Sequence, residues 1–190
     1  MPQRLKNCGY QTGLVGKLHF VPVDRDYGFE YKMLHDAPYS VYADDDKNSE
    51  YIKWLKENYF DKKGIDPVKL FDEDENSYDT DIRRFIAGED FRTEEEHDIP
   101  WTYNRSSEFI KNRDKDKPFF LFASFFGPHQ PYMTPSPWRD KFSYKDIVLP
   151  ENFDATMENS PIFNIKNKPL SDRLRKTFTP DDYRKLIALN

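Results

Sequence analysis

The chain has 190 residues, of which 37% are hydrophobic, a net charge of −5 from 29 basic and 34 acidic side chains, and a single cysteine. This length suits one domain of ordinary size, and no apolar run approaches the roughly 18 residues that a membrane-spanning helix needs. Because the two signs of charge are interleaved, we predict no nucleic-acid partner, and one cysteine excludes an internal disulfide and a thiolate metal cluster.

The first predicted elements along the chain are the end of a helix and a short strand. Residues 4–8 have the pattern of a last helical turn, which Gly9 closes. Residues 12–17 are predicted to be a strand, and residues 20–46, punctuated by proline and glycine, a loop. The N-terminal segment has no apolar core of the kind that a secretory signal needs, and the compartment is left open.

The next predicted helix runs from an N-cap at Ser49 to about Tyr59. Ile52, Leu55 and Tyr59 recur at helical spacing, which makes this face part of the predicted core. The polar stretch that follows, residues 61–93, is predicted to be irregular.

Residues 72–83 resemble a calcium-binding loop at their acidic start only. Ser77 stands where the sharp turn needs glycine, and Arg83 stands where a bidentate glutamate is needed. No pair of histidines has the spacing of a zinc site on one helix. We therefore predict no metal ligand in this chain.

The most strongly apolar stretch, residues 118–126, is predicted to be a buried strand. It is apolar on both faces, as a central strand covered by helices must be. Residues 101–113 before it form a predicted amphipathic helix with Phe109 and Ile110 on the buried side. A helix, a tight turn and a buried strand in this order indicate the α/β fold class.

The last third of the chain is rich in proline before it ends in a helix. Residues 127–169 are predicted to be short of regular structure. Their predicted aromatic anchors are Trp138, Phe142 and Phe153. Residues 179–182 combine an N-cap hydroxyl, a first-turn proline and two carboxylates, which mark a helix start. Because this helix has no stop signal and the first helix lacks its beginning, we expect an internal piece of a longer protein.

Two places put cationic or proton-exchanging side chains where a strand ends, which is where α/β folds gather their chemistry. Lys17 and His19 alternate in a segment predicted to be extended, so both side chains are expected on the same side. The ammonium can neutralise sulfate or phosphate oxygens, and the imidazole can exchange a proton with a nucleophile or leaving group. The alternative is a pair of exposed polar residues without a shared role.

His129 is the second candidate, because Pro128 and Pro131 stiffen the backbone around it after the predicted strand. The alternative is a histidine that caps the carbonyls of the strand. His35 and His97 lie in polar segments and are predicted to be exposed to solvent.

Two blocks of the sequence resemble the signature of the sulfatase family. Residues 9–19, GYQTGLVGKLH, are similar to the family's first block, GY-x-T-x-x-x-GK-x-H. Residues 118–121, PFFL, and 128–131, PHQP, are similar to its second block, PFFL followed by PH-x-P. The Gly-Phe at 28–29 and the segment 107–110 follow the family's order, and the resemblance covers nearly the whole chain.

The resemblance implies a partial alkaline-phosphatase-like fold, a mixed sheet flanked by helices, in which residues 1–190 are the central portion of the catalytic domain. It implies hydrolysis of a sulfate monoester of a small molecule or carbohydrate, with a formylglycine nucleophile and a calcium ion that binds the sulfate. By match of position, Lys17 would bind the sulfate and the formylglycine. His19 would hydrogen-bond the formylglycine diol and help to expel sulfate, and His129 would contact the sulfate or protonate the leaving oxygen.

The nucleophile and the metal ligands of the family have no matching position in this sequence. Formylglycine is made in a C/S-x-P-S-R motif; Cys8 lies outside such a motif, and Ser136 has no arginine after it. The resemblance implies that the family's acidic metal ligands would lie before Met1 and beyond Asn190. We therefore expect these groups to come from outside the chain, and the chain alone to lack turnover.

Two other functions stay open at this point. An enzyme of the same superfamily that hydrolyses a phosphate or phosphonate ester would share the fold and much of the cation arrangement. A truncated relic or binding module would recognise sulfated ligands without cleaving them. A fragment that does not fold alone is the other possibility, because the loss of neighbouring strands would leave strand edges unpaired and apolar faces exposed, which favours aggregation. The particular ester and the oligomeric state are not predicted.

Overall fold

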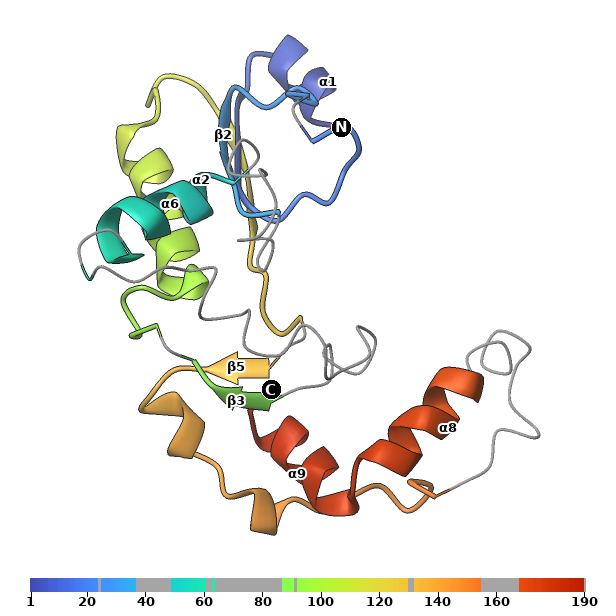
Figure 1. Ribbon diagram of the computed structural model, residues 1–190. Helices are drawn as coiled ribbons and strands as arrows, with labels where there is room; N and C mark the ends of the chain where they lie inside the picture. Colours follow the sequence, from blue (N-terminus) through green and yellow to red (C-terminus); the bar gives the residue numbers. More distant parts are fainter. Residues whose placement is uncertain are drawn as a thin grey trace. The chain divides into compact units, whose positions relative to one another are not determined.

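The computed structural model describes residues 1–23, 25–36, 49–60, 63, 87–90, 92–129, 132–154 and 168–189 (Figure 1). The chain forms two compact units. The first unit comprises Met1–Glu75 and Glu94–Gly127, and the second comprises Asn76–Thr93 and Pro128–Asn190. Each unit is described by itself below.

The described part of the first unit is built on a parallel sheet. Strand β1 (Gln11–Gly16) lies between β2 (Tyr31–Leu34) and β4 (Phe119–Ser124), and both pairs are parallel. This confirms the α/β class; we expected a mixed sheet, whereas the described strand pairs are all parallel. The register places Gly16 between Leu34 and Ser124, so the carboxyl ends of the three strands meet at one edge.

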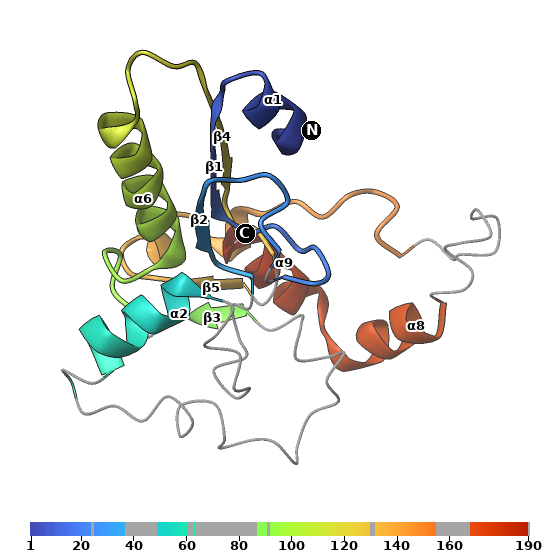
Figure 2. The same cartoon turned by 90° about the horizontal axis from the view of Figure 1, so that it is seen from above.

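Helix α6 (Asp98–Asn112) lies along one side of this sheet, as both views show (Figures 1 and 2). Its Phe109 ring packs so closely over Gly13 that a Cβ there would come within 2.8 Å of the ring. One cluster of buried apolar side chains in this unit consists of Leu14, Leu18, Phe29 and Leu34. Buried apolar side chains also come from α2 (Glu50–Leu55) and α6, among them Tyr51, Trp101 and Phe109.

The predicted helix end and strand at the N-terminus are confirmed. Helix α1 spans Pro2–Asn7, and β1 begins one residue earlier than expected. Gly9 has φ +86°, and its N–H donates to the Lys6 carbonyl (2.9 Å) while the Tyr10 N–H donates to the Leu5 carbonyl (3.0 Å). These two bonds are the Schellman pattern, in which a left-handed residue ends the helix.

The second predicted helix is also confirmed, with its cap. The Ser49 hydroxyl accepts the Ile52 N–H (3.3 Å), and α2 (Glu50–Leu55) continues as a π-helical segment, Lys56–Phe60. The predicted apolar face is buried, and Tyr51 and Phe60 are buried as well.

Several expectations for the helices and strands of the first unit are wrong. Residues 20–46 contain β2, which was expected to be loop. Ile110 on α6 is exposed rather than buried. In the described sheet β4 is a border strand and not a covered central one: Phe119, Phe122 and Phe125 remain 39–45% exposed. An apolar run reports which side chains favour burial, but it does not specify what covers them.

The second unit contains a short parallel pair and two helices. Strand β3 (Ala87–Glu89), which lies in a stretch expected to be irregular, pairs with β5 (Tyr132–Thr134). Two single-turn 3₁₀ helices follow, Trp138–Asp140 and Tyr144–Asp146. Helices α8 (Lys168–Thr177) and α9 (Pro180–Leu189) complete the described part (Figure 1).

Of the three predicted aromatic anchors in this unit, one is confirmed. The Phe153 ring packs edge-on against Tyr183 of α9, with centroids 5.1 Å apart. Trp138 and Phe142 are exposed, contrary to expectation. The calcium-like stretch 72–83 lies outside the described residues.

Helix α9 begins as predicted, with a reciprocal cap. The Thr179 hydroxyl donates to Asp182 Oδ2 (2.7 Å), and the Thr179 hydroxyl oxygen accepts the Asp182 N–H (3.3 Å). The same carboxylate accepts the Thr179 N–H (3.0 Å). The hydroxyl of Thr179, followed by its N–H and the Lys185 ammonium, lowers the pKa of the Asp182 carboxyl.

We expect Thr179→Ala to destabilise α9 by about 1 kcal/mol, the usual cost of losing an N-cap hydroxyl. Hydrogen exchange of the α9 amides measures this loss. Thr177→Ala is the control, because Thr177 only donates back to the Arg173 carbonyl within α8 and caps no helix start. Equal exchange rates in the two variants would contradict the capping role.

The cap also predicts the direction of a pH effect. Because the pKa of Asp182 is lowered in the folded state, its carboxylate stabilises α9 fully above its ordinary pKa, near pH 4. This contribution disappears as the pH falls through the lower folded pKa. Protection of the α9 amides should therefore fall at acid pH in the parent, and Thr179→Ala should reduce the acid-dependent part.

Candidate active site

The first candidate residue, Lys17, follows directly after β1 at the carboxyl edge of the sheet. Its N–H donates to the Ser124 carbonyl (3.0 Å), which ties its backbone to the end of β4. Its ammonium lies 4.3 Å from the centroid of the Phe126 ring. This is a cation–π contact, which holds the charge in a set direction without neutralising it.

His19 lies two residues beyond Lys17, on a turn held by a carboxylate. The Leu18 N–H donates to Asp36 Oδ1 (2.8 Å), and the His19 N–H donates to Oδ1 (2.7 Å) and Oδ2 (3.0 Å) of the same residue. Leu18 is buried in the core, whereas the His19 side chain is exposed. His19 has φ +56°, so the extended backbone assumed for this segment does not continue through it.

His35, which was predicted to be exposed, is buried, with 1% of its surface accessible. It follows β2, and its N–H donates to the Gly16 carbonyl (3.0 Å). Its ring lies 4.4 Å from Tyr51 and 5.3 Å from Phe126, and its Nε2 is 3.7 Å from Asp98 Oδ2. The sequence pattern missed β2, and with it the reason for this burial.

The prediction that His97 is exposed is also wrong. Its side chain is mostly buried at the start of α6, where Nδ1 accepts the Ile99 N–H (3.4 Å) and lies 3.0 Å from Asp98 Oδ1. His97 is therefore the N-cap of the helix.

Lys17, His35 and Phe126 thus lie together at one edge of the sheet. They come from three strand ends: Lys17 follows β1, His35 follows β2, and Phe126 lies just beyond β4. Phe126 touches both the Lys17 ammonium and the His35 ring. Sequence reasoning did not single out Phe126 or Asp36, because neither carries chemistry by itself. The signal that could have found them is their position just after a strand of a parallel sheet.

His129 lies in the second unit, five residues beyond the end of β4, and its side chain is exposed. Lys17 and His19 lie in the first unit. The convergence of His129 with the other two therefore stays a prediction.

The described residues do not fit a calcium site. Nowhere among them do three or more His, Cys, Asp or Glu side chains come together as a metal ion needs. Asp36, whose carboxylate lies against the turn that carries Lys17 and His19, accepts backbone N–H groups there. We assign no step to a metal in this chain.

Helices of the described part are all too short or too polar to cross a membrane.

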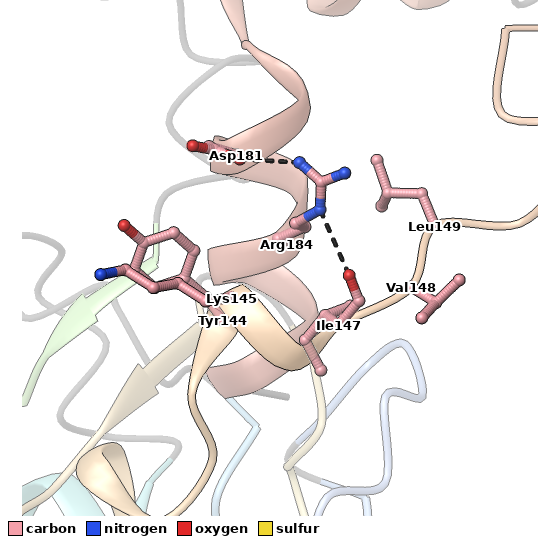
Figure 3. Close-up of a pocket in the computed structure, with 7 residues that line it drawn as sticks. All are labelled: Tyr144, Lys145, Ile147, Val148, Leu149, Asp181 and Arg184. Atoms are coloured by element: carbon pink, nitrogen blue, oxygen red, sulfur yellow. Dashed lines mark hydrogen bonds and ion pairs between the residues drawn. The ribbon is translucent and has the colours of Figure 1, made fainter.

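A cavity of about 470 Å³ in the second unit lies between the segment Tyr144–Leu149 and α9 (Figure 3). Arg184, its central cation, donates to the Ile147 carbonyl (3.2 Å) and pairs with Asp181 (2.7 Å), as the dashed lines in Figure 3 show. Because protein groups already engage this cation, we place no anion site there.

Comparison with known proteins identifies the family of this chain. A family model described as Sulfatase matches residues 1–175. An arylsulfatase of Clostridium perfringens is 34% identical over 153 residues, which is 76% of this chain and 29% of that protein. A choline-sulfatase of Rhizobium meliloti is 28% identical over 150 residues, or 77% of this chain and 26% of that protein. An arylsulfatase of Klebsiella aerogenes is 25% identical over 146 residues, or 75% and 26% respectively.

The chain therefore spans about a quarter to three tenths of the length of these relatives. The first matching block of the sequence, residues 9–19, contains β1 and the turn that carries Lys17 and His19. Because the family model matches residues 1–175, which is most of this chain, the chain belongs to the sulfatase family.

Proposed function

We propose that this chain is the central part of a sulfatase catalytic domain and supplies anion-binding groups for the hydrolysis of a sulfate monoester. The observation that carries the proposal is the position of Lys17 at the carboxyl edge of a parallel sheet, inside a chain that matches the sulfatase family. The names of the relatives, arylsulfatase and choline-sulfatase, favour a sulfate ester over a phosphate ester.

Lys17 binds the sulfate group in this proposal. Its ammonium is held by the Phe126 ring, and aromatic contact leaves hydrogen-bond donors for an anion. Its backbone cannot shift easily, since the Lys17 N–H is bonded to β4. A cation held in place before the ligand arrives loses little freedom on binding, which strengthens binding and favours developing negative charge.

The two histidines move protons in this proposal. His19 is exposed on the same turn as Lys17 and can exchange a proton with a group that attacks or leaves the bound anion. His129 contacts the sulfate or protonates the leaving oxygen, which requires it to approach Lys17 in the folded enzyme. Its position after β4 and between two prolines supports this role.

The attacking atom is not assigned to any residue of this chain. Cys8 is exposed beyond the end of α1 and lies outside the motif in which formylglycine forms. Lys17, His19 and His129 stabilise charge and move protons, but none of them is proposed as the nucleophile. We therefore expect the 190-residue protein, supplied with an aryl sulfate and calcium, to show no turnover in a sulfatase assay.

The proposed anion site is tested by sulfate binding, which needs no nucleophile. We expect the 190-residue protein to bind sulfate in a titration followed by NMR, with the largest shifts at Lys17 and His19. Lys17→Ala should weaken binding about tenfold or more, because a hydrogen bond to a charged group contributes about 1.5–3 kcal/mol.

Lys117→Ala is the matched control for this experiment. It makes the same change in net charge, but Lys117 precedes β4 at the opposite edge of the sheet and pairs with Asp114 (3.2 Å). It should leave the sulfate affinity nearly unchanged. Equal losses of sulfate affinity in the two variants would mean that only net charge matters, and would contradict a site at Lys17. In the sulfatase assay, rapid release of sulfate from an aryl sulfate by this chain would contradict the expectation that the nucleophile comes from outside it.

A further inference from the structure

The turn that carries Lys17 and His19 is held by one side chain from another part of the sequence. Asp36 lies 17 residues beyond His19, yet its carboxylate accepts two consecutive backbone N–H groups, those of Leu18 and His19. All three donor–acceptor distances are between 2.7 and 3.0 Å. Bonds from N–H groups to a carboxylate are roughly twice as strong as bonds between neutral groups.

The backbone of this turn needs such a partner. Gly16 has φ +94° and His19 has φ +56°, so the chain bends away from the strand on both sides of Leu18. A left-handed conformation costs a residue other than glycine about 1–3 kcal/mol and persists only where the surroundings enforce it. The carboxylate of Asp36 supplies that enforcement, because successive N–H groups in such a turn form an anion-binding concavity.

Asp36 is itself anchored at the end of β2. Its neighbour His35 is buried and donates its N–H to the Gly16 carbonyl (3.0 Å). The ends of β1 and β2 are therefore linked twice, once through the backbone at His35 and once through the Asp36 carboxylate. The first link fixes Asp36 at the edge of the sheet, and movement of the turn away from that edge would break the second.

Charge alone cannot explain a favourable effect of this carboxylate on an anion site. A negative group close to Lys17 and His19 repels a bound sulfate, and its removal should by itself strengthen anion binding. Positioning makes the opposite prediction, since removal frees the turn and the two side chains on it. The sign of the change in sulfate affinity therefore separates the two effects.

We propose that Asp36 is a positioning residue of the sulfate site, which orients Lys17 and His19 by accepting the N–H groups of Leu18 and His19. This inference rests on the proposed function of Lys17 and His19. Asp36 itself touches no substrate atom in this proposal.

The test uses Asp36→Asn and Asp36→Ala in the 190-residue protein. Asparagine keeps the shape and one acceptor oxygen, whereas alanine removes both. The matched control is Asp26→Asn, because Asp26 also accepts a turn N–H, that of Gly28 (3.0 Å), and carries the same charge. Gly28 lies against Gln3 and Thr12, towards the other end of β1.

Two readouts are measured in every variant. In NMR spectra we expect the Leu18 and His19 amide resonances to lose the downfield shift of a carboxylate-bound N–H in both Asp36 variants. In sulfate titrations we expect the dissociation constant to rise about fivefold in Asp36→Asn and further in Asp36→Ala, against the direction that charge predicts. Asp26→Asn should bind sulfate as tightly as the parent or slightly more tightly.

Each contrary result has a separate meaning. Failure of the parent to bind sulfate, or binding that Lys17→Ala leaves intact, would overturn the proposed site and this inference with it. Normal binding in the parent, lost in Lys17→Ala but unchanged or tighter in Asp36→Asn, would overturn only the inference about Asp36. Loss of amide dispersion throughout both Asp36 variants would make Asp36 a residue required for folding and would also overturn it.

Discussion

Replacement of Gly16 by alanine is expected to destabilise the first unit by about 4 kcal/mol or more, which places it among the most damaging single substitutions. Gly16 has φ +94°, where an L side chain is strained. A Cβ at this position would also clash with the Ser124 carbonyl oxygen and lie 2.9 Å from its carbon. That carbonyl accepts the Lys17 N–H, so the backbone of β4 cannot yield without breaking the bond that fixes Lys17.

Gly9→Ala is the control for this prediction. Gly9 has nearly the same backbone conformation, φ +86°, but nothing lies within 4 Å of the position of its Cβ. Its cost should be limited to the conformational strain, about 1–2 kcal/mol. Urea denaturation followed by circular dichroism measures both losses, and similar values for the two variants would refute the close approach of β4 to Gly16.

Tyr51→Ala is expected to cost about 3–5 kcal/mol, the range for removing a large buried aromatic side chain. The Tyr51 ring is fully buried, with centroids 4.4 Å from His35 and 5.4 Å from Trp101. Its hydroxyl donates to the Glu96 carbonyl (2.8 Å). The ring therefore joins α2, the end of β2 and α6, and its removal leaves a cavity between them.

Tyr51→Phe separates the ring from the hydroxyl. It keeps the ring contacts and removes one hydrogen bond, so the expected loss is about 1 kcal/mol. Denaturation midpoints of the two variants and the parent give the comparison. A loss in Tyr51→Phe close to that in Tyr51→Ala would show that the hydroxyl, and not packing of the ring, holds these elements together.

These two positions support the proposed site from different directions. Gly16 allows β4 to approach β1, and this approach places Phe126 beside the Lys17 ammonium. Tyr51 packs against His35, whose ring packs against Phe126 in turn. Packed rings beside the Lys17 side chain and a fixed backbone beneath it limit the motion of this side chain.

Local signals in the sequence were sufficient for the elements that carry their own caps or periodicity. Ser49 predicts the start of α2, and residues 179–182 predict the start of α9, because a cap acts on backbone groups a few residues away. Short strands lack such signals. Residues 31–34, YKML, are too few to show a clear alternation, and β2 forms because β1 pairs with it.

Burial was the least predictable property. Ile110 and Trp138 are apolar but exposed, whereas His35 is polar and buried. The partners of each side chain come from distant parts of the chain, so composition cannot specify them. The same holds for β4. The apolar run of residues 118–126 predicts a strand, but it does not predict that this strand lies at the border of the described sheet.

The amino-acid sequence by itself determined the chemical groups and their order: an ammonium and an imidazole two residues apart after a strand, in blocks that resemble sulfatases. Only the tertiary structure decided what surrounds them. The register of the parallel sheet places the ends of β2 and β4 beside the end of β1. Asp36 therefore lies against the turn at Leu18 and His19, and Phe126 lies against the Lys17 ammonium. The physical reason is that hydrogen bonds between strands link residues up to about a hundred positions apart, and no pattern within a short window contains that pairing.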